Sequence, residues 1–213
     1  MATFLRPLSY RYQWLYDAIS RTAALTVGGE RRFRHLPLQG LTITPETRVL
    51  DLCCGSGQTT RFLVEQSEQV TGLDISPRSL ERAQENVPQA TYVQGWAEEM
   101  PLADNSFDVV HTSAAMHEMT PAQRQQIFQE AGRVLRPGGT LAMVDFHRPH
   151  NPLLWPGLAL FLWLFETETA WQLLDSDVAT ELEKAGLQVT SFQLYGGGSL
   201  QVLHATKPAS APL

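Results

Sequence analysis

The sequence predicts an α/β fold in which helices wind around both faces of a mostly parallel sheet. Two observations indicate this fold. Short apolar segments alternate with segments of helical periodicity from residue 46 to residue 207, and this alternation is typical of a parallel sheet with connecting helices. Within it, the stretch V-L-D-L-C-C-G-S-G-Q-T-T at 49–60 has the order of a buried strand, a tight turn and a helix start.

The length of 213 residues suits one such domain with its own hydrophobic core. In the N-terminal part, apolar residues at three- and four-residue spacing predict an amphipathic helix at 9–25. This helix either docks on the core or covers a bound ligand, so Tyr10 and Tyr16 are candidates for substrate contact. We expect three parts: a helical lid segment at 1–45, the core domain at 46–207 and a disordered tail at 208–213.

The turn after the first core strand is a candidate ligand-binding corner. Gly55 and Gly57 allow the chain to turn sharply and leave backbone N–H groups open to a ligand. The second strand ends in Asp74, 23 positions beyond Asp51. A βαβ unit places a carboxylate at this point to accept hydrogen bonds from ribose hydroxyls. Together these features favour a nucleotide-type ligand at the carboxyl ends of the strands.

The remaining elements follow from apolar periodicity and from turn residues. Ser76 and Pro77 are typical of a helix N-cap and first helical position. The three glycines at 196–198 predict a hairpin, which adds an antiparallel strand to the sheet. In chain order we expect helices near 29–36 and at 59–68, a strand at 69–74, a helix at 77–86, strands at 91–94 and 105–112, a helix at 121–135, a strand at 140–146, a helix at 175–185, and strands at 187–195 and 199–206.

The run at 152–165 holds fourteen residues without a charge. A membrane-spanning helix needs about 20 apolar residues, and Pro152 and Pro156 interrupt this run, so we do not expect it to cross a bilayer. Two interpretations stay open. The run is either a core helix or an apolar wall or lid for a lipophilic substrate. In the second case the run itself could rest on a membrane surface. In that case Trp155 is also a candidate for substrate contact.

The charge balance restricts the partners of the protein. Sixteen basic residues against 22 acidic ones give a net charge of −6. This balance argues against a surface that binds nucleic acid, because such a surface needs clustered Lys and Arg. We interpret the basic cluster of Arg31, Arg32, Arg34 and His35 as a solvated helix end.

The two cysteines, Cys53 and Cys54, are adjacent in the chain. They are too close for an ordinary disulfide and too few for a zinc site, so we interpret them as small buried residues and expect no metal. Because the two cysteines form no expected disulfide, they favour a reducing compartment. Because Arg6, Pro7 and Arg11 interrupt any apolar leader, we expect a cytoplasmic protein.

Five motifs, in this order, resemble those of the class I S-adenosylmethionine-dependent methyltransferases. They cover roughly residues 48–207 and are V-L-D-L-C-C-G-S-G, G-L-D-I-S, G-W-A-E-E-M-P-L, N-S-F-D-V-V and R-V-L-R-P-G-G-T-L. In addition, Y-D-A-I-S at 16–20 and Y-G-G-G-S-L-Q-V-L-H-A at 195–205 are similar to the ubiquinone/menaquinone-biosynthesis C-methyltransferases. The resemblance implies a Rossmann-like sheet of seven strands and S-adenosylmethionine as the methyl donor.

The resemblance also implies a cofactor site at the ends of the first four strands. Its implied members are Asp51, Gly55 and Gly57 for the amino acid part, Asp74 for the ribose hydroxyls, Ile75 for the adenine face, Ala97 and Glu98 for the adenine edge, and Thr112 and Ser113 for the floor below the sulfonium. Two departures accompany it. Trp96 stands where the family commonly has Asp, and A-A-M-H-E-M at 114–119 replaces the G-L-R-N of the quinone enzymes, which bears on the quinone substrate rather than on methyl transfer.

Transfer of a methyl group to a hydroxylated ring is helped by a base that removes the hydroxyl proton. His117, which follows the fourth strand, is the first candidate. Glu118 could orient it or serve instead. The alternative for His117 is a capping or surface histidine. We interpret His111 as a packed core residue, whereas His147 and His150 compete for the role of base at the same edge of the sheet.

The sequence therefore predicts an enzyme that methylates a lipophilic or aromatic small molecule, for example a quinone or phenol precursor. Two alternatives stay open: an O- or N-methyltransferase of another small metabolite, and a cofactor-binding protein without catalytic activity that serves as a partner or regulator of another protein. A dehydrogenase is not expected because the third glycine of G-x-G-x-x-G is missing after Gly57. Nucleic-acid methylation is not expected because no N-P-P-Y motif follows the fourth strand.

Overall fold

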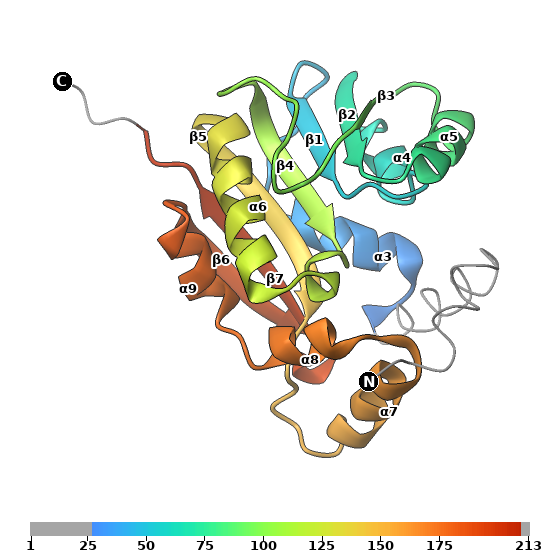
Figure 1. Ribbon diagram of the computed structural model, residues 1–213, viewed down its shortest axis with the longest axis vertical. Helices are drawn as coiled ribbons and strands as arrows, with labels where there is room; N and C mark the ends of the chain where they lie inside the picture. The colour runs from blue at the N-terminus through green and yellow to red at the C-terminus, as the bar shows by residue number, and fades with distance from the viewer. Residues whose placement is uncertain (1–26, 210–213) are drawn as a thin grey trace.

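A computed structural model describes residues 27–209 of the chain (Figure 1). The helix expected at 9–25 lies outside these residues. The elements are α3 (Glu30–His35), η2 (Leu36–Leu38), β1 (Arg48–Leu52), α4 (Thr60–Leu63), β2 (Gln69–Asp74), α5 (Pro77–Asn86), β3 (Thr91–Gln94), β4 (Phe107–Ser113), η3 (Met116–Glu118), α6 (Pro121–Val134), β5 (Leu135–Phe146), α7 (Trp155–Phe165), α8 (Glu168–Leu174), α9 (Val178–Lys184), β6 (Gln188–Tyr195), η4 (Gly196–Gly198) and β7 (Leu200–Thr206).

Seven strands of the described residues form one sheet in the order β3-β2-β1-β4-β5-β7-β6. The first five strands pair in parallel, and β7 runs antiparallel to both β5 and β6. This arrangement confirms the predicted Rossmann-like sheet with one antiparallel strand. The strand order reverses between β1 and β4, and a sheet of this kind opens a crevice at that point beyond the carboxyl ends of its strands.

Successive residues of the central strands face two different helical layers. Leu50 of β1 and Leu141 of β5 pack in one core cluster with Phe128 of α6, and α6 and α9 lie in front of the sheet in Figure 1. Val49 of β1 packs in another cluster with Leu63 of α4. The sheet is therefore buried on both faces, which explains why its strands are continuous apolar runs.

Several boundaries differ from the sequence predictions. β5 begins at Leu135 instead of residue 140, because Leu135 already pairs with Phe107 of β4. The register then shifts, and Thr140 pairs with Val109, so the predicted turn at 136–139 is a bulge within the strand. The helix expected at 175–185 begins at Val178, where the side chain of Asp177 accepts a hydrogen bond from the backbone of Thr180 and caps α9. A separate helix, α8, precedes it.

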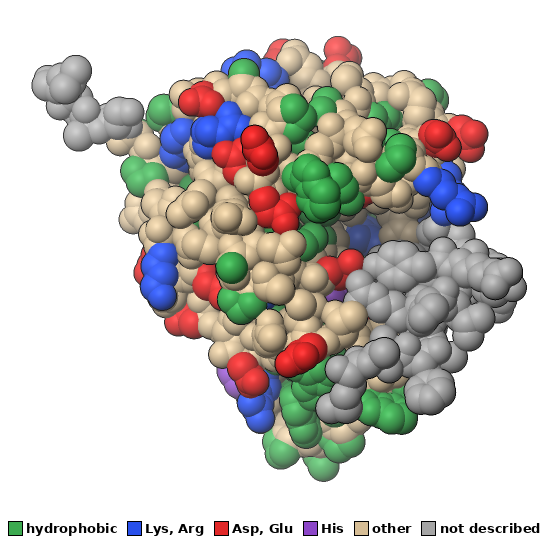
Figure 2. Space-filling view, viewed as in Figure 1, with side chains coloured by type: hydrophobic (Ala, Val, Ile, Leu, Met, Phe, Trp, Pro, Cys, Tyr) green, Lys and Arg blue, Asp and Glu red, His purple; other side chains and the backbone are tan. Residues whose placement is uncertain are grey.

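The apolar run at 152–165 forms α7 and the turn before it, with both buried and exposed side chains. Leu162 is fully buried, whereas Leu160 and Trp163 are 56% and 55% exposed and Leu153 is 85% exposed. Hydrophobic side chains gather at the lower end of Figure 2, where Figure 1 places α7. Within residues 27–209 none of the helices has the length and apolar character needed to span a bilayer.

Candidate active site

A cavity of about 490 Å³ opens at the carboxyl ends of β1, β2 and β4. Most residues of the implied cofactor site lie on its wall. Gly57 and Thr112 are not among its lining residues, and Thr112 is 1% exposed. The residues of the implied site that do line it are Asp51, Gly55, Asp74, Ile75, Ala97, Glu98 and Ser113.

The turn after β1 takes left-handed backbone conformations at three positions. Gly55 and Gly57 have φ of 55° and 82°, and Cys53 has φ of 58° although it carries a side chain. A Cβ on Gly55 would contact nothing within 4 Å, whereas a Cβ on Gly57 would lie 3.3 Å from the side chain of Val87. Gly55 therefore leaves space at the cavity, and Gly57 permits the turn to pack against the end of α5.

Asp51 is held by two side chains, Thr60 of α4 and His111 of β4. Its Oδ2 accepts a hydrogen bond from Thr60 Oγ1 at 2.6 Å, and its Oδ1 lies 3.0 Å from His111 Nδ1. His111 is fully buried, as predicted for a packed core residue. These bonds fix the carboxylate at the edge of the cavity.

Asp74 presents its carboxylate at the end of β2. Its Oδ2 accepts the backbone N–H of Gly55 and its Oδ1 accepts that of Ser76, each at 2.9 Å. Each carboxylate oxygen can accept a further bond. Ile75 follows it and is 43% exposed. Asp74 can therefore accept donors from a ligand in the cavity.

The far end of the cavity wall is formed by residues after β3. Trp96 lines the cavity and is 61% exposed, and Ala97 is 6% exposed. Glu98 accepts a hydrogen bond from Gln123 Nε2 at 2.8 Å. This end thus offers a flat aromatic surface and one carboxylate already held by a neighbour.

Arg34 is a cavity residue that the sequence analysis missed. It is 4% exposed and lines the cavity, so its interpretation as part of a solvated helix end is wrong. The interpretation holds for Arg31 and Arg32, which are exposed. α3 has only six residues, too few for a periodic pattern that shows which side faces inward.

His117 lies in η3, beyond the end of β4, and is 4% exposed. Its Nδ1 is 2.7 Å from Asp145 Oδ1 at the end of β5, and its Nε2 is 3.5 Å from Glu166 Oε2. Burial by itself would lower the pKa of His117. The charge of Asp145 and its hydrogen bond, together with Glu166 and Glu118, raise this pKa from 6.5 to about 9. The His117 imidazole therefore holds a proton more tightly than a free histidine does, and its contacts fix its orientation.

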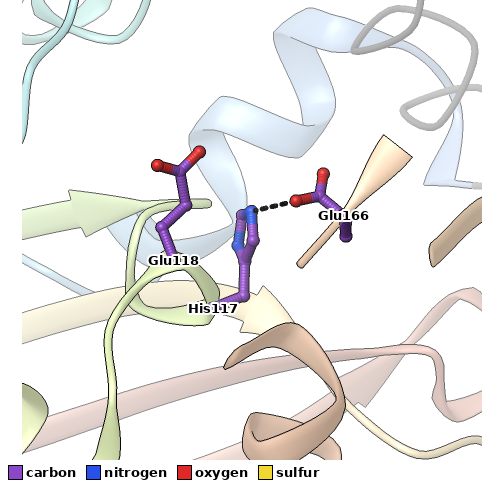
Figure 3. A group of neighbouring side chains, drawn as sticks. All are labelled: His117, Glu118 and Glu166. Atoms are coloured by element: carbon purple, nitrogen blue, oxygen red, sulfur yellow. Dashed lines mark ion pairs between the residues drawn. The ribbon is translucent and has the colours of Figure 1, made fainter. Parts of the chain in front are cut away.

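Figure 3 shows that His117 and Glu118 come from the same short helix and that Glu166 approaches from the end of α7. One ligand atom from each of the three lies within 4.8 Å of the others. A shared cation could bind there, and the same spacing allows proton transfer among the three groups. Glu118 also lines the cavity, so the group lies next to the site where a cofactor is expected.

An aromatic contact joins His117 to α7. The ring of Phe146 lies 4.7 Å from the His117 ring and 5.9 Å from Phe161, measured between centroids. Trp155 packs against Trp171 at 6.0 Å in the same apolar cluster and does not line the cavity. The candidate substrate residues Tyr10 and Tyr16 lie outside the described residues.

The competing histidines lie elsewhere at the end of β5. His147 Nδ1 donates to the backbone oxygen of Gly198 at 2.9 Å, and its ring contacts His150. Neither lines the cavity, and His117 itself is not among the lining residues, although its neighbour Glu118 is. Of the histidines after β4 and β5, His117 is thus the one with carboxylates at both ring nitrogens.

Comparisons with known proteins agree with this geometry. Residues 49–139 match a family model described as a methyltransferase domain. Over 205 residues the chain is 57% identical to an uncharacterized methyltransferase of Synechocystis sp., which covers 96% of this chain and 97% of that protein. The chain belongs to the S-adenosylmethionine-dependent methyltransferases. The methyltransferase is therefore an enzyme, and S-adenosylmethionine is its cofactor.

Two further relatives place the methyltransferase within this family. It is 32% identical over 160 residues to a 2-phytyl-1,4-naphtoquinone methyltransferase of Nostoc sp., covering 71% of this chain and 68% of that one. The solved structure of a SAM-dependent methyltransferase from Aquifex aeolicus superposes with a TM-score of 0.64 at 19% identity, covering 90% of this chain and 96% of that chain. The second likeness shows the shared fold.

The cavity fits such a cofactor. Gly55 leaves open space where a Cβ would stand, and Asp74 keeps acceptor capacity beside it for hydroxyl groups. The cavity wall carries the carboxylates of four residues and the guanidinium groups of three. The four are Asp51, Asp74, Glu98 and Glu118, and the three are Arg34, Arg78 and Arg82. The excess of carboxylates suits the positively charged sulfur of the cofactor.

Proposed function

We propose that the methyltransferase acts on a hydroxylated aromatic acceptor with a lipophilic portion, such as a reduced quinone or a phenol precursor. The observation that carries this proposal is the buried imidazole of His117 between Asp145 and Glu166, next to the cofactor cavity. One relative is named a 2-phytyl-1,4-naphtoquinone methyltransferase. A phytyl naphthoquinone is both aromatic and lipophilic, so this name supports the same class of acceptor.

In this proposal the cavity residues hold the cofactor by its polar groups. Asp74 accepts the ribose hydroxyls, Ile75 and Trp96 cover the faces of the adenine, and Ala97 and Glu98 border its edge. Their common position on one cavity wall supports these roles. When bound, the cofactor supplies a methyl group on a positively charged sulfur.

His117 is the proposed base for the acceptor hydroxyl. Asp145 orients the ring through Nδ1 and stabilises the imidazolium that forms when Nε2 takes the proton. A phenol has a pKa of about 10, which is close to the raised pKa of His117, about 9. The proton therefore moves from the phenol to the imidazole with little change in free energy. Glu118 or Glu166 then passes the proton onward.

The apolar side of α7 is the proposed wall for the lipophilic part of the acceptor. Phe146 contacts both His117 and Phe161, so the cluster around α7 begins beside the proposed base. Trp155 belongs to this cluster. An acceptor whose hydroxyl reaches His117 therefore also meets an apolar surface, because a single ring, that of Phe146, separates His117 from Phe161 of α7.

The test is methyl transfer from S-adenosylmethionine to reduced naphthoquinones with and without a long prenyl tail, and to a small polar phenol, with the methylated product measured by mass spectrometry. We expect the tailed acceptor to react fastest. The rate should rise with pH toward 9, because only the neutral imidazole can accept a proton. His117→Asn should lower the rate by about 10²–10⁴-fold.

His150→Asn is the matched control, since His150 is exposed and also follows β5; it should keep the wild-type rate and pH profile. A His117→Asn enzyme with the wild-type profile would show that His117 is not the base. Methylation of the small polar phenol, with no methylation of the naphthoquinones, would favour the alternative that the enzyme acts on another small metabolite. Binding of the cofactor without turnover on any acceptor would favour a partner-binding role.

A further inference from the structure

His117, Glu118 and Glu166 bring three potential metal ligands together beside the cofactor cavity. One ligand atom from each lies within 4.8 Å of the others (Figure 3). The three come from two separate segments, since His117 and Glu118 belong to η3 and Glu166 directly follows α7. An imidazole nitrogen with two carboxylates is a donor set that suits Zn²⁺ and similar divalent transition metals. The sequence prediction of no metal was drawn from the two cysteines, which are not members of this group.

The spacing within this group matches the geometry of a tetrahedral metal ion. His117 Nε2 lies 3.5 Å from Glu166 Oε2. Two ligand atoms that each lie about 2.1 Å from a tetrahedral Zn²⁺ are about 3.4 Å from one another. The nitrogen and the carboxylate oxygen are therefore already at the separation that Zn²⁺ requires. A rotation within the Glu118 side chain, whose carboxylate lies within 4.8 Å of both, completes a set of three ligands.

Asp145 fixes the imidazole of His117 in the orientation that a metal ligand needs. Its Oδ1 lies 2.7 Å from His117 Nδ1, so the neutral ring donates from Nδ1 and presents the lone pair of Nε2 to Glu166. Asp145 is itself 1% exposed, and its Oδ2 accepts the backbone N–H groups of Met116 and His117. A carboxylate in this position is the usual partner of a metal-bound histidine, because it sets the tautomer and raises the basicity of the ligand nitrogen. The fold therefore holds the ring ready for an ion.

We propose that His117 Nε2, Glu118 and Glu166 bind a divalent transition metal ion of the zinc class, and that this ion inhibits methyl transfer. The inhibition rests on the proposed function, in which the same lone pair of Nε2 accepts the proton of the acceptor hydroxyl. A metal ion and a proton cannot share that lone pair. The ion also occupies the two glutamates that would pass the proton onward. Binding of the ion and removal of the proton therefore exclude each other.

The test is calorimetric titration of ZnCl₂ into the purified protein at a fixed pH, with MgCl₂ as the second ion. We expect Zn²⁺ to bind and Mg²⁺ not to bind, because Mg²⁺ requires octahedral oxygen ligands and keeps several of its waters. Glu166→Gln removes the charge of one ligand and keeps its size. This variant and His117→Asn should each weaken Zn²⁺ by about 100-fold or more, since loss of an outer-shell partner alone costs about 10–100-fold.

Two control variants should keep the wild-type dissociation constant for Zn²⁺. Glu168→Gln makes the same substitution at an exposed glutamate two residues beyond Glu166, and Cys53→Ser removes a thiol that lines the cofactor cavity. Absence of Zn²⁺ binding, unchanged binding in Glu166→Gln, or loss of binding in Cys53→Ser would overturn the proposal. If either Glu166→Gln or His117→Asn does not fold by thermal melting, the other variant decides.

The methylation assay separates failure of this proposal from failure of the proposed function. Inhibition of the wild-type enzyme at Zn²⁺ concentrations near the measured dissociation constant supports the proposal. Zn²⁺ binding that depends on His117 but leaves methyl transfer undiminished would support the metal site and refute both the inhibition and the role of His117 as the base.

Discussion

Asp145→Asn removes the charge that holds His117. The carboxylate of Asp145 is 1% exposed. Its Oδ2 accepts the backbone N–H groups of Met116 and His117, and its Oδ1 accepts the His117 ring and the backbone N–H of Phe146. An asparagine has one acceptor oxygen, so two of these four donors would face an NH₂ group. At about 1.5–3 kcal/mol for each bond to a charged group, we expect the free energy of unfolding to fall by about 3–5 kcal/mol, the usual loss when a buried pair is broken.

The pH dependence gives this prediction a second measure. In the folded protein the pKa of His117 is about 9, above its ordinary value of 6.5. A raised pKa stabilises the fold at pH values below 6.5, and this stabilisation is lost as the pH rises through 9. At about 1.4 kcal/mol for each pKa unit, the loss amounts to about 3 kcal/mol. Asp145→Asn should remove most of this slope, because the charge of Asp145 is the main cause that raises the pKa.

The assay is urea unfolding of both proteins at intervals from pH 6 to pH 10, the range that spans the two pKa values of His117. Asp175→Asn serves as the control. Its side chain is 71% exposed and pairs with Arg148, so its stability should change by less than about 1 kcal/mol. The reasoning is refuted if Asp145→Asn costs no more than this control, or if wild type and variant have parallel pH profiles.

Three further predictions concern β2, α7 and the turn after β1. Gly72→Ala places a Cβ 2.9 Å from both Cys54 Sγ and the ring of Tyr92, and we expect thermal unfolding to report a loss of about 1–3 kcal/mol from overpacking. Gly157→Ala, with open space around it inside a helix, should instead gain about 0.5–1 kcal/mol; changes of the same sign would contradict this. Burial and acidic neighbours raise the pKa of the Cys53 thiol far above its usual range, so iodoacetamide should label Cys53 in urea but not in the folded protein at neutral pH, and rapid labelling of the folded protein would refute it.

Local sequence patterns predicted the parts of the site that one segment supplies. Asp74 lines the cavity because a βαβ unit fixes the end of its second strand relative to the turn after its first. Ile75, Ala97 and Glu98, which the resemblance to the methyltransferase family implied, also line the cavity. Arg34 was misinterpreted because the inward side of a six-residue helix has no periodic signal.

The sequence by itself determined the α/β class, the mostly parallel sheet and the edge of the sheet at which the cavity lies, because these follow from apolar periodicity and turn residues within short segments. Only the tertiary structure brought Asp145 and Glu166 to the two nitrogens of His117, and Arg34 to Ser113 across 79 positions of the chain. Such pairs depend on how separate elements pack against one another. No residue in either segment carries a pattern that names its partner, so the chemistry of the site was decided by packing.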